Sequence, residues 1–256
     1  MRGGPYKHQA VNTKFPSRCR TMYALLLSFA LLSQLCSADS IPDDPSNSRR
    51  VLHIVLDGLT ARSVDSLLSD GRLPNLAKLK ANGAFTDNAR IDHDSSQTLP
   101  THVSMFTGMN VEDHGVKDDK DPGTPKSING LENIFDLVSD ANIGDTCFFG
   151  SKDKFKFFER SSWSITYFDY NKNGDDTIKS IREKMNSRDP CRYAFVHFRE
   201  PDKAGHADGP DGKEYHRAVE LADEYVGQVL EIYKSLRMLD QTAIIVMPDH
   251  GFEVDR

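Results

Sequence analysis

Three short, continuous apolar runs predict buried strands in this chain. They span residues 51–56, 193–198 and 243–247, and branched and aromatic side chains dominate them. Runs of this length without polar alternation are typical of parallel strands that are covered on both faces. An aspartate follows closely after each run, namely Asp57, Asp202 and Asp249.

Helical spacing of apolar residues separates these runs. It extends over residues 64–82, 131–141 and 213–239. Strands that alternate with helices predict an α/β fold, here a doubly wound, mostly parallel sheet with helices on both faces. Ligands of open α/β sheets bind beyond the carboxyl ends of the strands, so the three aspartates are expected to share one site. The segment 118–129 is charged, rich in Gly and Pro, and predicts a surface loop.

The first 38 residues have the pattern of a secretory signal peptide. Basic residues precede an apolar run over residues 22–35, and small residues follow up to Ala38. The run is shorter than the roughly 20 residues that span a bilayer, which favours cleavage near Ala38 over a retained signal anchor. We therefore expect a polar linker over 39–50, a domain over 51–256, and a secreted or extracellular protein. A membrane-anchored protein with an extracellular domain is the alternative.

Composition and charge describe an ordinary globular chain. With 256 residues and 38% hydrophobic content, one α/β domain is the default expectation. The net charge of -6 gives no general attraction to nucleic acid or anionic membranes, so an anionic substrate needs local positive charge, which metal ions would supply. Outside the signal segment, Cys147 and Cys191 remain. They form either a disulfide or two separate buried thiols.

Three segments carry candidate metal ligands. At the end of the third run, Asp249 and His250 can both reach one divalent ion because Gly251 permits a sharp turn. Asp202 and His206 can converge on an ion if a loop or turn brings them together. Asp57 ends the first run. Taken singly, each segment is more simply explained as a helix cap or a polar loop.

A fourth segment changes that balance. Residues 97–108 read QTLPTHVSMFTG, and EDHGV follows at 112–116. Asp57 precedes these segments, and the motifs Asp-x-x-x-His at 202–206 and Asp-His-Gly at 249–251 follow them. With these motifs in this order, the chain from about residue 51 onward resembles the alkaline phosphatase superfamily. The most similar branch is that of nucleotide pyrophosphatases and type I phosphodiesterases, whose threonine nucleophile corresponds to Thr98. The joint occurrence in order is specific, whereas each piece alone is not.

The resemblance implies two divalent ions, and mixed Asp and His ligation suits Zn²⁺. It also implies their ligands: Asp57, Thr98, Asp249 and His250 for one ion, and Asp202 and His206 for the other. Metal coordination would make the poorly nucleophilic hydroxyl of Thr98 reactive. The implied activity is hydrolysis of phosphodiester or nucleotide pyrophosphate bonds through a phospho- or nucleotidyl-threonine. The expected substrate is small and phosphorylated, such as a nucleotide, rather than a specific nucleic-acid sequence.

Recognition of the substrate departs from the family pattern. Relatives place an asparagine shortly after the His-Gly step, where it binds a phosphate oxygen, and Asp119 takes its position here. A carboxylate would repel a phosphate, so a neighbour takes the role or the substrate differs. Lys152 and Lys154 lie in a segment similar to one in phosphonoacetate hydrolases, where lysines contact the anionic substrate. A solvated basic loop is the alternative.

Several other functions stay open. Within the superfamily they are a phosphomonoesterase, a phosphonate hydrolase and a sulfatase-like hydrolase, although sulfatases carry a Cys or Ser where Thr98 stands. A truncated, inactive secreted binding protein is a further alternative. The family has another His ligand downstream of Asp-His-Gly, whereas this sequence ends at Arg256. The domain is therefore expected to be incomplete, and the ion at Asp202 and His206 to be held less tightly.

Remaining aromatic and imidazole side chains are assigned no chemistry. Five histidines are expected to be structural or exposed: His53, His102, His114, His197 and His216. One aromatic cluster lines a pocket or, as we favour, forms a satellite core: Phe155, Phe157, Phe158, Trp163, Tyr167 and Phe168.

Overall fold

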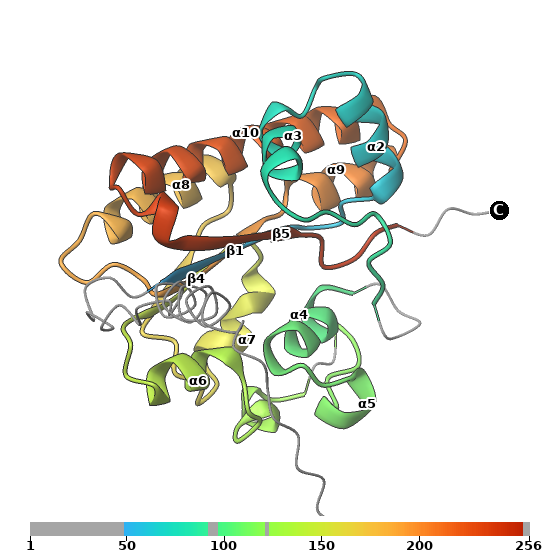
Figure 1. Ribbon diagram of the computed structural model, residues 1–256. Helices are drawn as coiled ribbons and strands as arrows, with labels where there is room; N and C mark the ends of the chain where they lie inside the picture. Colours follow the sequence, from blue (N-terminus) through green and yellow to red (C-terminus); the bar gives the residue numbers. More distant parts are fainter. Residues whose placement is uncertain (1–48, 92–96, 121–122, 253–256) are drawn as a thin grey trace, which may run out of the picture. The chain divides into compact units, whose positions relative to one another are not determined.

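The computed structural model describes residues 49–91, 97–120 and 123–252; the predicted signal peptide and all but the last two residues of the linker lie outside these ranges. A parallel five-stranded sheet forms the centre, in the order β3-β2-β4-β1-β5 (Figure 1). Its strands are β1 (Arg50–Leu56), β2 (Thr146–Gly150), β3 (Tyr167–Tyr170), β4 (Tyr193–Phe198) and β5 (Thr242–Met247). The predicted α/β fold with a parallel sheet is confirmed.

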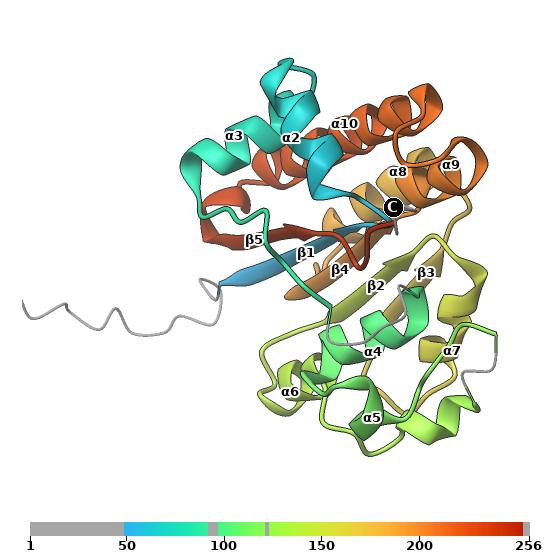
Figure 2. The ribbon, with the colours of Figure 1, turned by 90° about the vertical axis from the view of Figure 1, so that its right-hand side faces the viewer.

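Helices cover both faces of this sheet (Figure 2). One layer holds α2 (Ala61–Ser69), α3 (Pro74–Asn82), α8 (Gly174–Met185), α9 (Glu200–Asp208) and α10 (Lys213–Ser235). The other holds α4 (Thr98–Thr107), α5 (Val111–His114), α6 (Ile134–Asp140) and α7 (Lys156–Glu159). Within the described ranges, no helix combines the length and the apolar character that crossing a bilayer requires.

Side chains of β1 alternate between two apolar cores, as expected for a strand covered on both faces. Leu52, Ile54 and Leu56 enter the core beneath α8 and α10. Val55 enters the second core, between the sheet and α4, α6 and α7. Aromatic rings dominate this second core, and the predicted satellite core is confirmed for four members of the aromatic cluster: Phe155, Phe157, Phe158 and Trp163.

The long helix predicted over 64–82 is wrong, because the structure divides it into α2 and α3. Gly71 takes a left-handed backbone with φ 70°, and Pro74 is the first residue of α3. A proline fits the first turn of a helix but breaks a helix interior, since it lacks the amide hydrogen. The helical spacing of apolar residues therefore continues across a break between two helices.

Two strand predictions also need correction. β2 and β3 were not predicted, and they are the two shortest strands, with five and four residues. β5 was predicted as a buried strand, yet it lies at the sheet edge, and Ile245 is 44% exposed. Among the described residues no strand pairs with its outer side. Composition alone cannot separate a central strand from an edge strand, because that difference depends on which neighbours pair.

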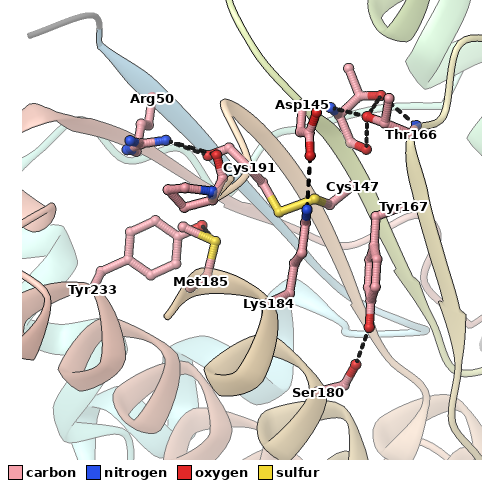
Figure 3. Close-up of a disulfide and its surroundings, with 12 residues drawn as sticks. Arg50, Asp145, Cys147, Thr166, Tyr167, Ser180, Lys184, Met185, Cys191 and Tyr233 are labelled. Atoms are coloured by element: carbon pink, nitrogen blue, oxygen red, sulfur yellow. Dashed lines mark hydrogen bonds and ion pairs between the residues drawn. A yellow bond between two sulfur atoms is a disulfide. The ribbon is translucent and has the colours of Figure 1, made fainter. Parts of the chain in front are cut away.

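A disulfide joins Cys147 and Cys191, which settles the alternative that the sequence left open (Figure 3). Cys147 belongs to β2, and Cys191 lies just before β4, the strand that pairs with β2. The Nζ of Lys184 donates a hydrogen bond to Asp145 Oδ2 over 2.8 Å beside this bridge. The bridge therefore ties β2, which precedes Lys152, to the start of β4, which precedes Asp202.

Candidate active site

The structure brings together the three aspartates that follow the strands. Asp57 follows β1, Asp249 follows β5, and Asp202 lies in α9, just beyond β4. All three side chains are buried. Their grouping follows from the topology, because β4, β1 and β5 are adjacent and parallel, so their carboxyl ends lie at one edge.

Close approach of these segments depends on Gly58. Its φ is +68°, and a Cβ added there would lie 2.9 Å from both Cα and Cβ of Asp202. Its amide donates a hydrogen bond to Asp249 Oδ1 over 3.1 Å. A larger residue would therefore strain the backbone and push the strand ends apart.

Thr98 lies at the start of α4 and is buried. Its Oγ1 accepts a hydrogen bond from Lys152 Nζ over 2.9 Å. Its carbonyl oxygen accepts from His102 Nδ1 over 2.7 Å, which holds the first turn of the helix in place. The positive end of the helix dipole thus lies at the hydroxyl group and favours negative charge there.

Asp202 and His206 were expected to converge through a loop or turn, but both lie on α9. Residues four apart on a helix share one face. His206 Nε2 is accordingly 3.3 Å from Asp202 Oδ1. The two differ in exposure, since Asp202 is buried whereas the His206 side chain is 73% exposed.

His250 faces two of the carboxylates. Its Nε2 lies 3.3 Å from Asp57 Oδ1 and 3.6 Å from Asp249 Oδ2. Its Nδ1 lies 3.0 Å from the carbonyl oxygen of Gly251, which can only accept, so Nδ1 carries the hydrogen. Burial lowers the pKa of His250, but the neighbouring charges of Asp249 and Asp57 outweigh burial and raise that pKa, which favours a protonated ring whose Nε2–H faces the carboxylates.

Burial makes the charges of this group costly. It raises the pKa of Asp249 to about 7, and the neighbouring charge of Asp57 adds to the effect. Burial alone would also raise the pKa of Asp57, but His197 and Lys152 hold that pKa well below its usual range. Four oxygens of the three aspartates have ion-pair contacts but no hydrogen bond of good geometry: Asp57 Oδ1 and Oδ2, Asp202 Oδ1 and Asp249 Oδ2.

Two groups of buried side chains have the geometry to hold a metal ion within the described part of the chain. One is Asp57, Asp202 and His250, and the other is His102, His197 and Asp249. In each group the ligand atoms lie within 4.8 Å of one another. Mixed carboxylate and imidazole donors fit Zn²⁺, and the carboxylate oxygens without hydrogen bonds fit a cation. The first group draws on both of the ligand sets that the family resemblance implies.

His197 and His102 were predicted to have no role, yet both contact the aspartates. His197 Nε2 lies 3.1 Å from Asp57 Oδ2, and its Nδ1 lies 2.7 Å from Ser151 Oγ. His102 Nδ1 lies 3.7 Å from Asp249 Oδ2. Burial lowers the pKa of both rings, and each ring can position a carboxylate. For His197 the signal in the sequence is an imidazole inside the otherwise apolar strand β4, whereas His102 lies in α4, four residues after Thr98.

The predicted substrate residues lie beside the same centre. Asp119 Oδ1 accepts a hydrogen bond from the amide of Leu99 over 2.7 Å, at the first turn of α4, and Lys154 Nζ pairs with Asp119 Oδ2. Lys154 therefore offsets the charge of the Asp119 carboxylate. A cavity of about 750 Å³ is lined by residues that include Thr98, Asp119, Lys152, Lys154, Asp202 and His206.

We expect Asp119→Asn to tighten the binding of inorganic phosphate. The variant removes a negative charge from the helix N-terminus and frees Lys154 to pair with the anion. One charged hydrogen bond corresponds to roughly a tenfold change in dissociation constant, measurable by calorimetry. Asp118→Asn is the control, because Asp118 lines the same cavity. An equal gain in both variants would show that general charge, rather than this contact, governs anion binding.

Comparison with known proteins places the chain in a family. The profile of the type I phosphodiesterase / nucleotide pyrophosphatase family matches residues 51–254. Mouse ectonucleotide pyrophosphatase/phosphodiesterase family member 1 is 27% identical over 247 residues, which cover 87% of this chain and 26% of the relative. Human bis(5'-adenosyl)-triphosphatase ENPP4 is 23% identical, with 88% of this chain and 52% of the relative covered. The chain thus spans between a quarter and about half of these relatives.

Solved structures share the fold. An inactive variant of murine ectonucleotide pyrophosphatase/phosphodiesterase 5, in complex with AMP, has a TM-score of 0.66 at 20% identity. The match covers 80% of this chain and 57% of the chain in that structure. A 2-O GAG sulfatase, BT1596, has a TM-score of 0.63 at 14% identity and covers 80% and 58%. The family profile covers most of the chain, and the chain therefore belongs to the type I phosphodiesterase / nucleotide pyrophosphatase family.

Proposed function

We propose that this chain carries the active site of a metal-dependent hydrolase of phosphodiester or nucleotide pyrophosphate bonds, with Thr98 as the nucleophile. The observation that carries the proposal is the position of Thr98 Oγ1, at a helix N-terminus and bound to the lysine that also contacts Asp57 and Asp202. Family membership supports the reaction class.

The proposed centre binds two zinc ions. Their ligands are Asp57, Thr98, Asp249 and His250 for one ion, and Asp202 and His206 for the other. Burial of the three aspartates and the grouping of Asp57, Asp202 and His250 support adjacent cations. Zinc would make the threonine hydroxyl more acidic and offset charge on the reacting phosphate. With only two protein ligands named, the second ion is expected to be the more easily lost.

Thr98, His102 and Lys154 have separate roles in the proposed reaction. Thr98 Oγ1 forms a bond to phosphorus while the ester oxygen leaves, and the hydroxyl proton passes to solvent through the cavity. Water afterwards cleaves the phospho-threonine and restores the hydroxyl. His102 holds the Thr98 carbonyl and thus the direction of the first helical turn. Lys154 offsets the charge of Asp119 next to the incoming anion.

The proposed substrate is a small phosphorylated molecule such as a nucleotide or another phosphodiester. A cavity of about 750 Å³ is within the usual range for small-molecule sites. Among the similar proteins, one structure contains AMP and one relative is a bis(5'-adenosyl)-triphosphatase. The net charge of -6 gives no support for long nucleic acids as substrates.

We also place the protein outside the cell, either secreted or anchored by its N-terminal apolar segment. The disulfide between Cys147 and Cys191 supports an oxidising compartment. Protein for the assays below is therefore collected from the medium or the outer surface of cells that express the whole chain. Retention in the cytosol would contradict this location.

Metal removal tests the proposed function. We expect dialysis against a chelator to reduce the hydrolysis of bis(4-nitrophenyl) phosphate by about 10³-fold or more, because a metal ion contributes several kcal/mol to such a reaction. Added Zn²⁺ should restore the rate. Parallel assays with a phosphomonoester, a phosphonate and a sulfate ester separate the alternative activities. Zinc binding without hydrolysis of any of these would favour a binding protein.

A further inference from the structure

Lys152 occupies a position at the centre of the proposed metal ligands. Its Nζ lies 2.5 Å from Asp57 Oδ2, 2.7 Å from Asp202 Oδ2 and 2.9 Å from Thr98 Oγ1. The ammonium group donates hydrogen bonds to Asp202 Oδ2 and Thr98 Oγ1, and its contact with Asp57 Oδ2 is an ion pair. The residue is only 9% exposed, so these contacts replace nearly all of its hydration.

The backbone around Lys152 is held on both sides. Ser151 precedes it, is fully buried, and hydrogen bonds His197. The carbonyl of Lys152 accepts from the amide of Phe155 over 3.0 Å, and the Phe155 ring packs against His197 with 4.6 Å between centroids. The main chain is therefore anchored, whereas the four-carbon stem of the lysine can change rotamer at little cost.

The oxygens that surround this ammonium are the ones that the proposed ions require. Asp57 and Thr98 belong to one proposed ligand set, and Asp202 belongs to the other. An ammonium and a divalent cation repel each other strongly at contact distance in a buried site. They cannot hold the same oxygens at the same time.

We propose that Lys152 is a resident cation of this centre that divalent metal must displace. Its ammonium holds Asp57 and Asp202 together; when zinc takes these oxygens, Nζ moves into the adjoining cavity, where it can bind an anionic substrate. The inference rests on the proposed function. It gives the lysine two successive partners, first the ligand carboxylates and then the substrate.

Lys154 provides a matched comparison. It lies two residues away, lines the same cavity, and pairs with Asp119. Its hydrogen bond and ion pair are with Asp119 rather than with Asp57, Asp202 or Thr98. A change in general positive charge affects both lysines alike, whereas direct competition for metal ligands involves only Lys152.

Zinc titration of the full chain tests the proposal with Lys152→Met and Lys154→Met. We expect Lys152→Met to bind zinc at least about tenfold more tightly, because the metal no longer displaces charged hydrogen bonds. After treatment with a chelator, the same variant should melt at a lower temperature than the unsubstituted protein, since two buried carboxylates have lost their cation. Lys154→Met should match the unsubstituted protein in zinc affinity.

Lysine labelling of the unsubstituted protein gives a second measurement, which does not depend on folding of the variant. An amine-acylating reagent followed by peptide mass spectrometry reports the reactivity of each lysine with and without zinc. Zinc should raise the labelling of Lys152 and leave that of Lys154 nearly unchanged.

Two results would overturn the inference alone: zinc affinity that is equal or weaker in Lys152→Met, or zinc that protects Lys152 from labelling. In either case zinc-dependent hydrolysis would leave the proposed function intact. Failure of every variant and of the unsubstituted protein to bind zinc would overturn both this inference and the proposed function.

Discussion

Thr98→Ala should abolish phosphodiester cleavage, with a loss of about 10³-fold or more, because it removes the atom that forms the covalent bond to phosphorus. Thr98→Ser keeps a hydroxyl at the same position and should retain measurable activity. The readout is the initial rate with bis(4-nitrophenyl) phosphate at saturating zinc. Trapping of a phosphorylated peptide that contains residue 98 from the unsubstituted enzyme would identify the intermediate directly.

Thr107→Ala is the control for this substitution. Thr107 is the last residue of the same helix; its hydroxyl donates a hydrogen bond to the Val103 carbonyl and accepts one from the Met109 amide. We expect this variant to keep its activity and its fold. Full activity in Thr98→Ala would contradict the nucleophile assignment, and equal losses in both variants would indicate general damage to α4.

Loss of the disulfide should have the largest effect on stability. Cys147 and Cys191 are separated by 44 positions, and closing a loop of this length stabilises the fold by about 4 kcal/mol in the chain-entropy account. We therefore expect the double substitution Cys147→Ala with Cys191→Ala to lower the free energy of unfolding by about this amount. Guanidinium denaturation followed by circular dichroism measures it.

Reduction provides the matching control for the disulfide prediction. A reducing agent should destabilise the unsubstituted protein and leave the double alanine variant unchanged. If reduction has no effect on the unsubstituted protein, the bridge does not contribute to stability as proposed. A loosened β2 should also weaken the placement of Lys152, because Gly150, Ser151 and Lys152 are consecutive in the chain.

Local patterns were sufficient for part of this structure. The run over 51–56 predicted β1, because a strand that is buried on both faces needs apolar side chains on both. An aspartate after each of three adjacent parallel strands was expected to meet the other two, and Asp57, Asp202 and Asp249 do so. The resemblance to the family singled out Thr98 by its sequence context. The family profile that matches residues 51–254 supports that resemblance.

Errors arose where structure depends on partners distant in the chain. The edge position of β5 depends on which strands pair, and the strands β2 and β3 are too short for their composition to reveal them. The break between α2 and α3 was visible in Gly71 and Pro74 but was outweighed by the apolar period. A side-chain period describes the face of an element and not the continuity of its backbone.

The sequence by itself determined the strands β1, β4 and β5, the alternation of strands with helices, and the residue types at the carboxyl ends of these strands, because these depend on short-range periodicity and turn chemistry. Only the tertiary structure decided what those residues contact. It placed His197 on Asp57, Lys154 on Asp119, and Lys152 among Asp57, Asp202 and Thr98. Such contacts join positions that are far apart in the chain, and side-chain direction at that range follows from packing rather than from sequence spacing.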